Sequence, residues 1–452
     1  MKKSIIAALM ALLAISMASA QKTPAPQSAK QDLAIFALGY HGWDIPKSAL
    51  GEIDAQIQKN FLDLGRFKII GMTHRLASTD IEAFIAKITE AKEENFVLPA
   101  AIKFGDVQLT KAEFNKIIKA YIVAIPVVNK LEVARQKDGE LRASLSVSIS
   151  FVDVASNTLV GIANIKTSGK DSKRDDAIAK AISSIPMNMQ YEVRKIEQFR
   201  NKTTISKVTG SEIIIGVGAN LGVKMGDEYA ILETKTIAGS EDQVETGLAI
   251  IKEVGKEAST ATVIIPSAKI EEAVPVAEIA RLGVDLDVFF KALIGYGSSF
   301  TSGDIALDGD VVTPILGVKV TYSRGFYALR PFTVIQIPLN TFHSGDSWSY
   351  GHWTASLVNW MVGAEYNIYM NRLTLAPAAA IGLGGYNFTP EYGSSKTSLS
   401  HIGLYLGGKA SWHITRDIKI NGEVGYEHWI EAGDYYGSYG GLAVAVSGTY
   451  KF

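Results

Sequence analysis

Charged side chains recur at alternate positions in the last third of the sequence, inside stretches that are otherwise apolar. In residues 441–452 (GLAVAVSGTYKF), apolar or aromatic side chains fall on one side and small or polar ones on the other. Such alternation predicts a β-strand with one apolar and one polar face. Extending the pattern to the preceding stretches gives one inward face with eleven charged groups: Asp285, Asp287, Lys291, Lys319, Arg330, Glu365, Lys409, Lys419, Glu423, Glu427 and Lys451.

These groups could do three kinds of work. An eight-stranded barrel is just wide enough for its own side chains, and charges buried in it must be paired. We therefore expect a plug of ion pairs that holds the barrel shut. A path for a small ion or proton is the second use, and a catalytic pair of carboxylates is the third.

Aromatic residues form two further sets. Those near strand ends on the outward face are expected to form an interfacial girdle: Trp360, Tyr366, Trp412, Tyr426, Tyr450 and Phe452. Tyr450 and Phe452 also resemble the carboxy-terminal signal by which barrel proteins are recognised for assembly, although the usual glycine would fall one residue earlier than Gly448. The second set lies in the expected outer loops: Trp348, Tyr350, His352, Trp353, Tyr435, Tyr436 and Tyr439. It suits extracellular ligand contact or an upper girdle at lipid head groups.

Other chemistry finds little support in the sequence. The chain has no cysteine, which excludes disulfides, thiolate catalysis and an acylated amino-terminal cysteine. None of the seven histidines has the i, i+4 partner of a helical metal site. Gly216, Gly218 and Gly222 miss the dinucleotide-binding spacing. We predict no catalytic residue, cofactor or metal site, and hence no enzyme.

The charged and aromatic sets depend on eight predicted strands with the period-2 pattern. Their ranges are 284–298, 311–323, 326–338, 353–369, 373–387, 399–414, 417–430 and 440–452. Each exceeds the roughly 9 to 11 residues that cross a bilayer when tilted. Tight turns alternate with longer polar connections, which is the outer-membrane pattern. Residues 283–452 are therefore expected to form an antiparallel transmembrane β-barrel.

The amino-terminal end carries targeting features. Residues 1–20 have two lysines, an apolar run and a small-residue site at 18–20, which predict a signal peptide, and 21–31 is a polar linker. With 47% hydrophobic and 20% charged residues the chain can bury a large core. A formal net charge of −1 gives no reason to expect that the chain binds nucleic acid through its overall charge.

Two soluble units are expected between linker and barrel. Helical periodicity at 47–64, 79–93 and 171–185 alternates with strands and predicts an α+β domain over 32–200, with its helices on one face of a largely antiparallel sheet. Residues 203–266 have short strands and glycines, which predict a small all-β domain. Residues 267–282 are expected to be a connector.

Both soluble units resemble known families. The segments "LGRFKIIG" (64–71) and "YIVAIPVV" (121–128), with their helices, resemble the TolB amino-terminal-like fold shared by curli-secretion lipoproteins and the middle domain of flagellar assembly protein T. Unlike the curli-type members, this chain has no cysteine to acylate. Residues 203–266 are similar to the carboxy-terminal β domain of flagellar assembly protein T-like proteins through Gly218, Gly222, Gly226 and Asp227. The first resemblance implies a role in building or bracing envelope assemblies.

The combined expectation is an outer-membrane protein whose barrel anchors residues 21–282 in the periplasm, where they bind or brace another envelope component. Its partners would be outer-membrane lipid, the barrel-assembly machinery, and a periplasmic protein or further copies of the chain. The alternative is a small transport or enzyme barrel that acts through its lumen or its extracellular loops.

Overall fold

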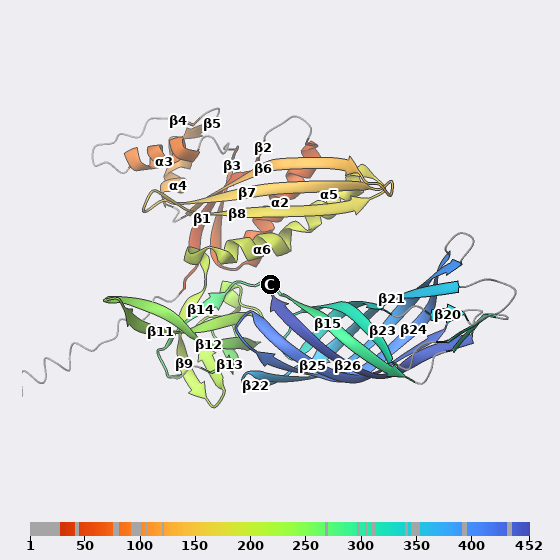
Figure 1. Ribbon diagram of the computed structural model, residues 1–452. Coiled ribbons are helices and arrows are strands. Elements are labelled where there is room, and N and C mark those ends of the chain that lie inside the picture. Colours follow the sequence, from red (N-terminus) through yellow and green to blue (C-terminus); the bar gives the residue numbers. More distant parts are fainter. Residues whose placement is uncertain are drawn as a thin grey trace, which may run out of the picture.

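The computed structural model describes residues 28–40, 45–75, 81–91, 101–104, 107–119, 122–266, 270–295, 299–302, 305–308, 312–339, 342–344, 353–390, 396–431 and 436–452. They form an α+β unit, a small closed barrel and a larger barrel (Figure 1). The expected signal peptide and most of the expected linker lie outside the described residues.

The α+β unit is built on a mixed sheet in the order β3-β1-β6-β7-β8. Its strands are β1 (Gln31–Ala37), β2 (Gly39–Tyr40), β3 (Phe67–Arg75), β6 (Ile122–Arg135), β7 (Leu141–Asp153) and β8 (Thr158–Asp171). β1 runs parallel to β3 and β6, whereas β6, β7 and β8 are antiparallel. A helix connects β1 to β3, and such a crossover returns the chain in the same direction. The expected largely antiparallel sheet is thus mixed.

Helices cover both faces of this sheet, so the prediction of helices on one face was wrong. α2 (Lys47–Asp63), α5 (Arg174–Ser183) and α6 (Ile185–Lys195) share one core with the sheet. α3 (Ile81–Glu90), α4 (Lys111–Lys119), β4 (Ala101–Phe104) and β5 (Val107–Thr110) share a second core with it. The reason lies in β6, whose first seven residues (IVAIPVV) are all buried. A strand apolar on both faces needs cover on both.

The small unit is a closed barrel in the order β10-β13-β12-β11-β14-β9. Its strands are β9 (Lys202–Thr209), β10 (Glu212–Ile215), β11 (Glu228–Ile237), β12 (Ser240–Val254), β13 (Ser259–Ile265) and β14 (Pro275–Ile279). β14 pairs with β9 and β11 and so closes the barrel, although it lies within the expected connector 267–282. Pro275 is the first residue of β14, a position at which proline is tolerated in a strand.

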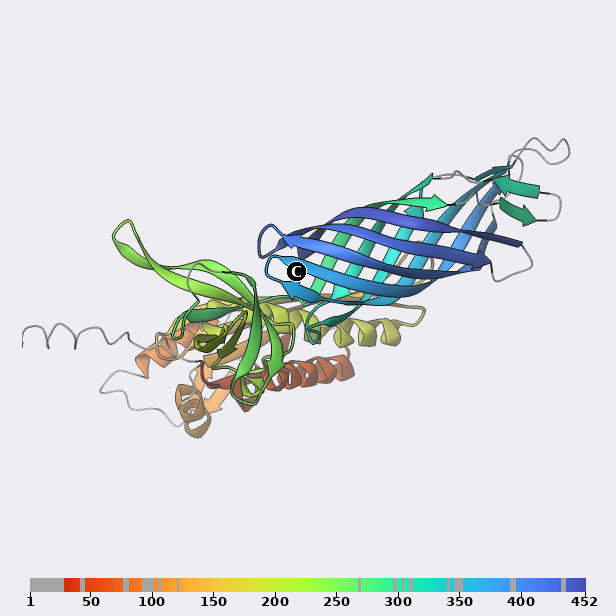
Figure 2. The same ribbon diagram turned by 90° about the horizontal axis from the view of Figure 1, so that it is seen from below.

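The large barrel has the eight long strands that the sequence predicts. They are β15 (Val284–Gly295), β18 (Val312–Tyr322), β19 (Leu329–Pro338), β21 (Trp353–Tyr366), β23 (Leu373–Pro390), β24 (Lys396–His413), β25 (Ile418–Glu431) and β26 (Tyr436–Lys451). β26 pairs antiparallel with β15 from Lys451 to Gly441, which closes the sheet. Shorter strands extend it: β16 (Ser299–Ser302), β17 (Ile305–Asp308), β20 (Phe342–Ser344) and β22 (Ile368–Met370). Figure 2 shows the long strands tilted around the barrel.

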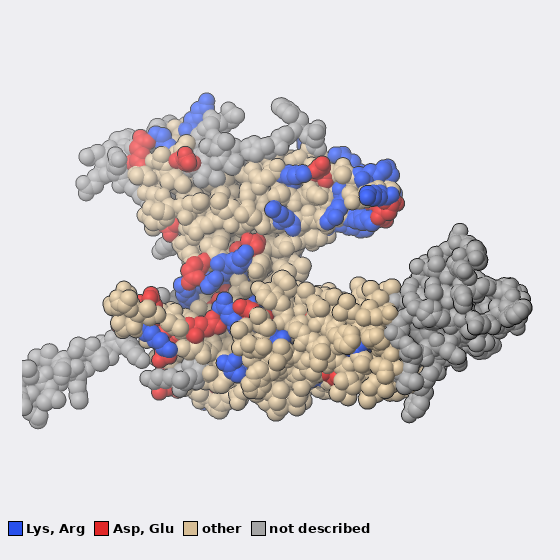
Figure 3. Space-filling model, viewed as in Figure 1, with Lys and Arg blue, Asp and Glu red and all other residues tan. Residues whose placement is uncertain are grey.

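The outer wall of the large barrel is apolar on every long strand. One outward residue per strand illustrates this: Phe290, Leu316, Ile335, Trp360, Leu383, Leu406, Val424 and Val446, with exposed fractions from 45% for Trp360 to 71% for Leu406. All six predicted girdle aromatics also face outward. On the side seen in Figure 3 the described wall shows few charged side chains. The barrel is therefore apolar outside and, as shown below, charged inside.

Among the described residues, none of the helices is both long enough and apolar enough to cross a membrane.

The end of the large barrel that carries the chain terminus lies against the small barrel (Figures 1 and 2). The N–H of Leu282 donates to the carbonyl of Phe452 at 2.8 Å, and that of Gly325 donates to the carbonyl of Met225 at 2.7 Å. The tight turn at 323–325 is therefore docked on the small barrel.

Two glycines of the small barrel allow close approach of its neighbours. Gly222 (φ +73°) lies against the α+β unit, where an added Cβ would be 2.0 Å from the carbonyl oxygen of Leu64. Gly226 (φ +78°) lies against the large barrel, where an added Cβ would be 2.1 Å from the carbonyl oxygen of Ser323. Both glycines combine a left-handed backbone with a contact that leaves no room for a side chain.

The Gly222→Ala substitution should weaken the docking of the α+β unit on the small barrel. Gly210→Ala is the matched control, because Gly210 also has a positive φ (+61°) but nothing within 4 Å of an added Cβ. Both variants should lose about 1–2 kcal/mol through the left-handed backbone, and only Gly222→Ala should lose more through the clash. Thermal unfolding and limited proteolysis would measure the difference. Equal losses would contradict the close-approach role.

Candidate functional site

The strand register places opposite charges directly across from each other inside the large barrel. Cross-strand neighbours of this kind have Cβ atoms about 4.5–5.5 Å apart. Four such pairs occur: Asp285 with Lys451, Asp287 with Lys319, Arg330 with Glu365, and Lys409 with Glu423. The alternation therefore sets which face the charges take. It does not set their partners, because among the described residues none of these four neighbouring pairs forms an ion pair, and the charges pair instead with groups on other strands.

The structure brings all eleven predicted inward charges into the barrel interior. Glu423 is half-buried, and the other members are buried: Asp285, Asp287, Lys291, Lys319, Arg330, Glu365, Lys409, Lys419, Glu427 and Lys451. Because an isolated charge is very costly to remove from water, such groups have to pair.

Two clusters of ion pairs, one around Glu365 and one around Asp285, lie in the half of the lumen nearer the small barrel. Glu365 accepts hydrogen bonds from Lys319 at 2.7 Å and from Lys409 at 2.9 Å. Asp285 pairs with Lys419 at 2.9 Å and with Arg330 at 3.5 Å. Each carboxylate thus meets two cations, and each pair joins two strands that are separated by one long strand in the wall.

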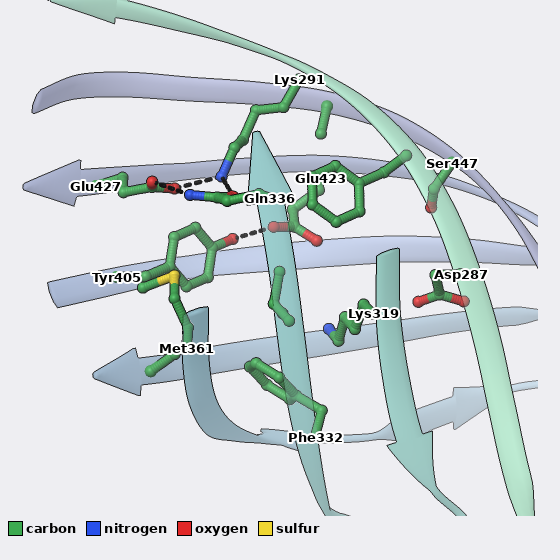
Figure 4. Close-up of a pocket in the computed structure, with 14 residues that line it drawn as sticks. Asp287, Lys291, Lys319, Phe332, Gln336, Met361, Tyr405, Glu423, Glu427 and Ser447 are labelled. Carbon is green, nitrogen blue, oxygen red and sulfur yellow. Dashed lines mark hydrogen bonds and ion pairs between the residues drawn. The ribbon is translucent and has the colours of Figure 1, made fainter. Parts of the chain in front are cut away.

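A third ionic group lies further along the lumen (Figure 4). Glu427 pairs with Lys291 and accepts a hydrogen bond from Trp429 Nε1 at 2.7 Å, and Gln336 bonds to both members of the pair. Beside it, the Tyr405 hydroxyl donates to Glu423 at 2.6 Å.

The space left between these side chains is about 30 Å³. That volume matches about one water molecule. Asp287 lines the space, and its Oδ1 has no hydrogen-bond partner among the described residues. In the described part of the lumen, ion-paired side chains therefore occupy most of the space around this cavity.

The mouth of the large barrel is closed from outside by the small barrel. Glu228 on β11 pairs with Lys451, and Arg281 binds Glu228 at 3.0 Å and Asp417 at 2.6 Å. Burial raises the pKa of Glu228, but the charges of Lys451 and Arg281 outweigh it and lower the pKa below its usual range. A carboxylate of the soluble unit thus completes the charge pairing of the barrel.

Apolar and hydroxyl contacts support this closure. Tyr327 and Tyr369 of the large barrel pack against a buried cluster on the small barrel that includes Leu248 and Ile250. The hydroxyls of Thr262 and Tyr327 are hydrogen-bonded at 2.7 Å. The two barrels therefore share a packed interface rather than a flexible link.

The three units meet at a buried ionic cluster that we call the junction, formed by Arg66, Arg194, Asp227, Glu278 and Arg324. Glu278, on β14, binds Arg66 at 2.6 Å and Arg194 at 2.6 Å. Asp227, just before β11, binds Arg194 at 3.2 Å and Arg324 at 2.9 Å. Arg66 and Arg194 belong to the α+β unit and Arg324 to a turn of the large barrel.

The junction works as a unit because its charges stabilise one another. Burial disfavours the charged form of Glu278, yet Arg66 and Arg194 hold its pKa well below the usual range. Burial likewise opposes the charge on Arg194, but Glu278 and Asp227 raise its pKa above the ordinary value. Breaking such a buried pair typically costs about 3–5 kcal/mol, because the remaining charge is left uncompensated.

Sequence reasoning missed the junction. Only Asp227 was singled out there, as part of a family resemblance. The signal available was Glu278, a single carboxylate between buried Val276 and Ile279 in a short apolar segment. A lone charge at a core position indicates a buried ionic partner, but the partner lies more than 80 residues away along the chain.

The predicted loop aromatics are not brought together in the described part of the chain. Trp348, Tyr350, His352 and Tyr435 lie outside the described residues. Trp353, Tyr436 and Tyr439 lie in β21 and β26, but the description does not extend to their side chains. Within the described residues, no group of three or more histidine, cysteine, aspartate or glutamate side chains is arranged to hold a metal ion.

Comparison with known proteins gives no family for the chain. No protein-family model and no curated protein matches it. Solved structures similar to part of it include Neisserial surface protein A (13% identity, TM-score 0.28, 38% of this chain and 97% of that one). Another is the Yersinia pestis attachment invasion locus protein Ail, with 15% identity and a TM-score of 0.24 over 38% of this chain and 99% of that one. A third is the amino-terminal β-barrel domain of Pseudomonas aeruginosa OprF, with 11% identity and a TM-score of 0.21 over 37% of this chain and 96% of that one.

All three TM-scores lie below 0.5, so the description of the barrel rests on the strand pairing of this chain. The resemblances of residues 32–200 and 203–266 to the TolB-like and flagellar assembly protein T-like folds stay predictions.

The Glu427→Gln substitution should destabilise the large barrel by about 3–5 kcal/mol, because Lys291 would keep a buried charge without a counter-ion. Adding Lys291→Met should recover much of that loss, since the double variant buries no unpaired charge. Urea unfolding, followed by the shift in gel mobility between unboiled and boiled samples, would measure both. A double variant less stable than Glu427→Gln would contradict the pairing.

The junction should make docking of the units sensitive to acid only at low pH. Because the folded-state pKa of Glu278 is lowered, its contribution is present above about 4.5 and is lost as pH falls through the folded value. The contribution of Glu278 to the free energy of unfolding of the soluble units should stay constant between pH 7 and 5 and should decrease below pH 4.5. Glu278→Gln should flatten this decline, whereas Glu253→Gln, on the exposed surface, should not. Identical profiles would contradict the assignment.

Proposed function

We propose that this chain is an outer-membrane protein whose large barrel anchors two periplasmic units that bind or brace another envelope component. One observation carries the proposal: a closed barrel with an apolar wall on all eight long strands encloses paired charges. Apolar surface on this scale is costly in water and is matched by the hydrocarbon of a bilayer. A closed barrel also pairs every backbone group that lipid could not satisfy.

The outward-facing aromatic residues support the location of the large barrel in the outer membrane. Trp360, Tyr366 and Trp412 are about half exposed on the wall, as residues of an interfacial girdle would be. Tyr450 lies on β26 and Phe452 follows it directly; β26 pairs with β25 and closes the barrel on β15. Aromatic side chains on the closing strand suit the proposed recognition by the barrel-assembly machinery.

The arrangement of the units supports a periplasmic place for residues 21–282. Both soluble units are attached at the end where tight turns join the strands, which in outer-membrane barrels faces the periplasm. The expected signal peptide would export the chain to that compartment.

A bracing or binding role is supported by the junction and by the sealed lumen. The junction holds the α+β unit against both barrels through buried ion pairs. A force that a bound partner exerts on that unit would therefore be transmitted to the membrane anchor. The alternative, a barrel that transports or catalyses through its lumen, needs open space there, and the described lumen offers about 30 Å³. The periplasmic partner would be a protein of the envelope or further copies of this chain.

The soluble units should capture the partner without the large barrel. The fragment for this test is 21–282, because β14 is needed to close the small barrel. At about 260 residues with two cores of its own, it is large enough to fold. It should retain from periplasmic extract the component that cross-links to the full-length protein in intact envelopes. The loop alternative would be supported if the folded fragment retains nothing while substitution of Trp348 or Tyr435 abolishes the function of the full-length protein in cells.

A further inference from the structure

A cleft of about 420 Å³ opens between the α+β unit and the small barrel. Its walls come from the segment 28–31 before and at the start of β1, from Arg66 and Phe67 at the start of β3, and from residues 197–202 that connect the two units. Ser28 is held in this wall by hydrogen bonds with the backbone of Lys202, at 2.7 Å and 3.1 Å. The cleft is therefore built from three segments that are far apart in the sequence.

Positive charge dominates the cleft. Four cations line it, Lys30, Arg66, Arg200 and Lys202, against one carboxylate, Glu197. Arg200 and Lys202 both share Glu197, at 2.9 Å and 2.7 Å. A single carboxylate therefore neutralises only part of this charge.

The junction behind the cleft does not supply the missing anions. It contains three arginines, Arg66, Arg194 and Arg324, but only two carboxylates, Asp227 and Glu278. Lys224 lies close by, and burial together with the charge of Arg324 lowers its pKa. Counting Arg66 once, cleft and junction hold six cations and three carboxylates, without Lys224. The three arginines of the junction are largely buried, whereas Lys30 is exposed and the side chains of Arg200 and Lys202 are 36% and 43% exposed. This excess of cations over carboxylates favours an added anion.

Two donors in the wall have no partner. Arg66 is only 4% exposed, and its terminal nitrogens donate hydrogen bonds to the carbonyl of Phe199 and to Glu278. Its Nε is buried and donates to no atom of the described residues, and the same is true of Arg200 Nε. An unpaired buried donor costs about 1–3 kcal/mol, so these N–H groups are available to a ligand.

We propose that this cleft binds a phosphate group carried by a periplasmic solute or by a lipid head group. The excess charge favours a dianion or diester phosphate held by more than one cation, and guanidinium N–H groups make strong, directional bonds to phosphate oxygens. Water could satisfy the free N–H groups but could not balance the charge. The site lies where the α+β unit meets the small barrel, so an occupied cleft would add a tie between them.

Isothermal titration of the full-length, detergent-folded protein tests the proposal with inorganic phosphate, glycerophosphoglycerol and acetate as separate probes. One of the two phosphate probes should bind at one site per chain, and the tighter one identifies the source as a free solute or a lipid head group. Arg200→Gln and Lys30→Gln should each weaken that binding about tenfold or more, through loss of a charge-assisted contact.

Lys207→Gln is the control, because Lys207 is exposed on β9 and does not line the cleft. It should bind as the unaltered chain does. Unboiled gel mobility would show that each variant retains the folded barrel. Absence of saturable phosphate binding, equal binding by the Arg200 variant and the control, or tighter binding of acetate than of either phosphate probe would overturn the proposal. None of these results depends on the identity of a protein partner.

Discussion

The charged side chains of the narrow lumen have to be paired if the large barrel is to be stable. The apolar wall of the large barrel can face lipid only if the polar half of each strand is satisfied inside. Glu365 and Asp285 each bridge two cations, and Glu427 joins a lysine, a glutamine and a tryptophan. The ion pairs join strands that are not direct neighbours in the wall, so they add ties inside the barrel to the backbone hydrogen bonds between adjacent strands.

The same constraint extends into the soluble part of the chain. Lys451 finds its counter-ion on the small barrel, at Glu228, and Arg324 in the barrel turn finds one at Asp227. The large barrel is therefore electrostatically complete only when the small barrel is docked. The strands β6 to β8 extend alongside the large barrel in both views (Figures 1 and 2), and lipid around the wall has to fit beside them.

Period-2 patterning was sufficient to predict the large barrel, its eight long strands and the residues that face its lumen. This worked because a strand with lipid on one side and packed charge on the other has an unambiguous sequence pattern. The small barrel was harder, because β14 is five residues long and begins with proline. Helices on both sheet faces were missed because β6 is apolar throughout, and such a strand does not reveal its neighbours from sequence alone.

The junction could not be predicted from local patterns. Glu278 meets Arg66 and Arg194 across separations of 212 and 84 residues, and nothing in the spacing of these residues marks them as partners. The glycines at 222 and 226 were noticed as part of a resemblance, whereas their physical role is to let two other units approach the backbone. Sequence patterns predicted the units of this protein, and only the fold showed how they are joined.

If the large barrel is a sealed anchor rather than a conduit, ions should not pass through its lumen. Electrical recording from the purified full-length protein in a planar lipid bilayer measures this. We expect insertion without unitary conductance steps, because paired side chains fill the lumen and the small barrel closes its mouth. Stable unitary steps that change size when Glu365 is replaced by glutamine would show an open path past that carboxylate, and the barrel would then be a conduit.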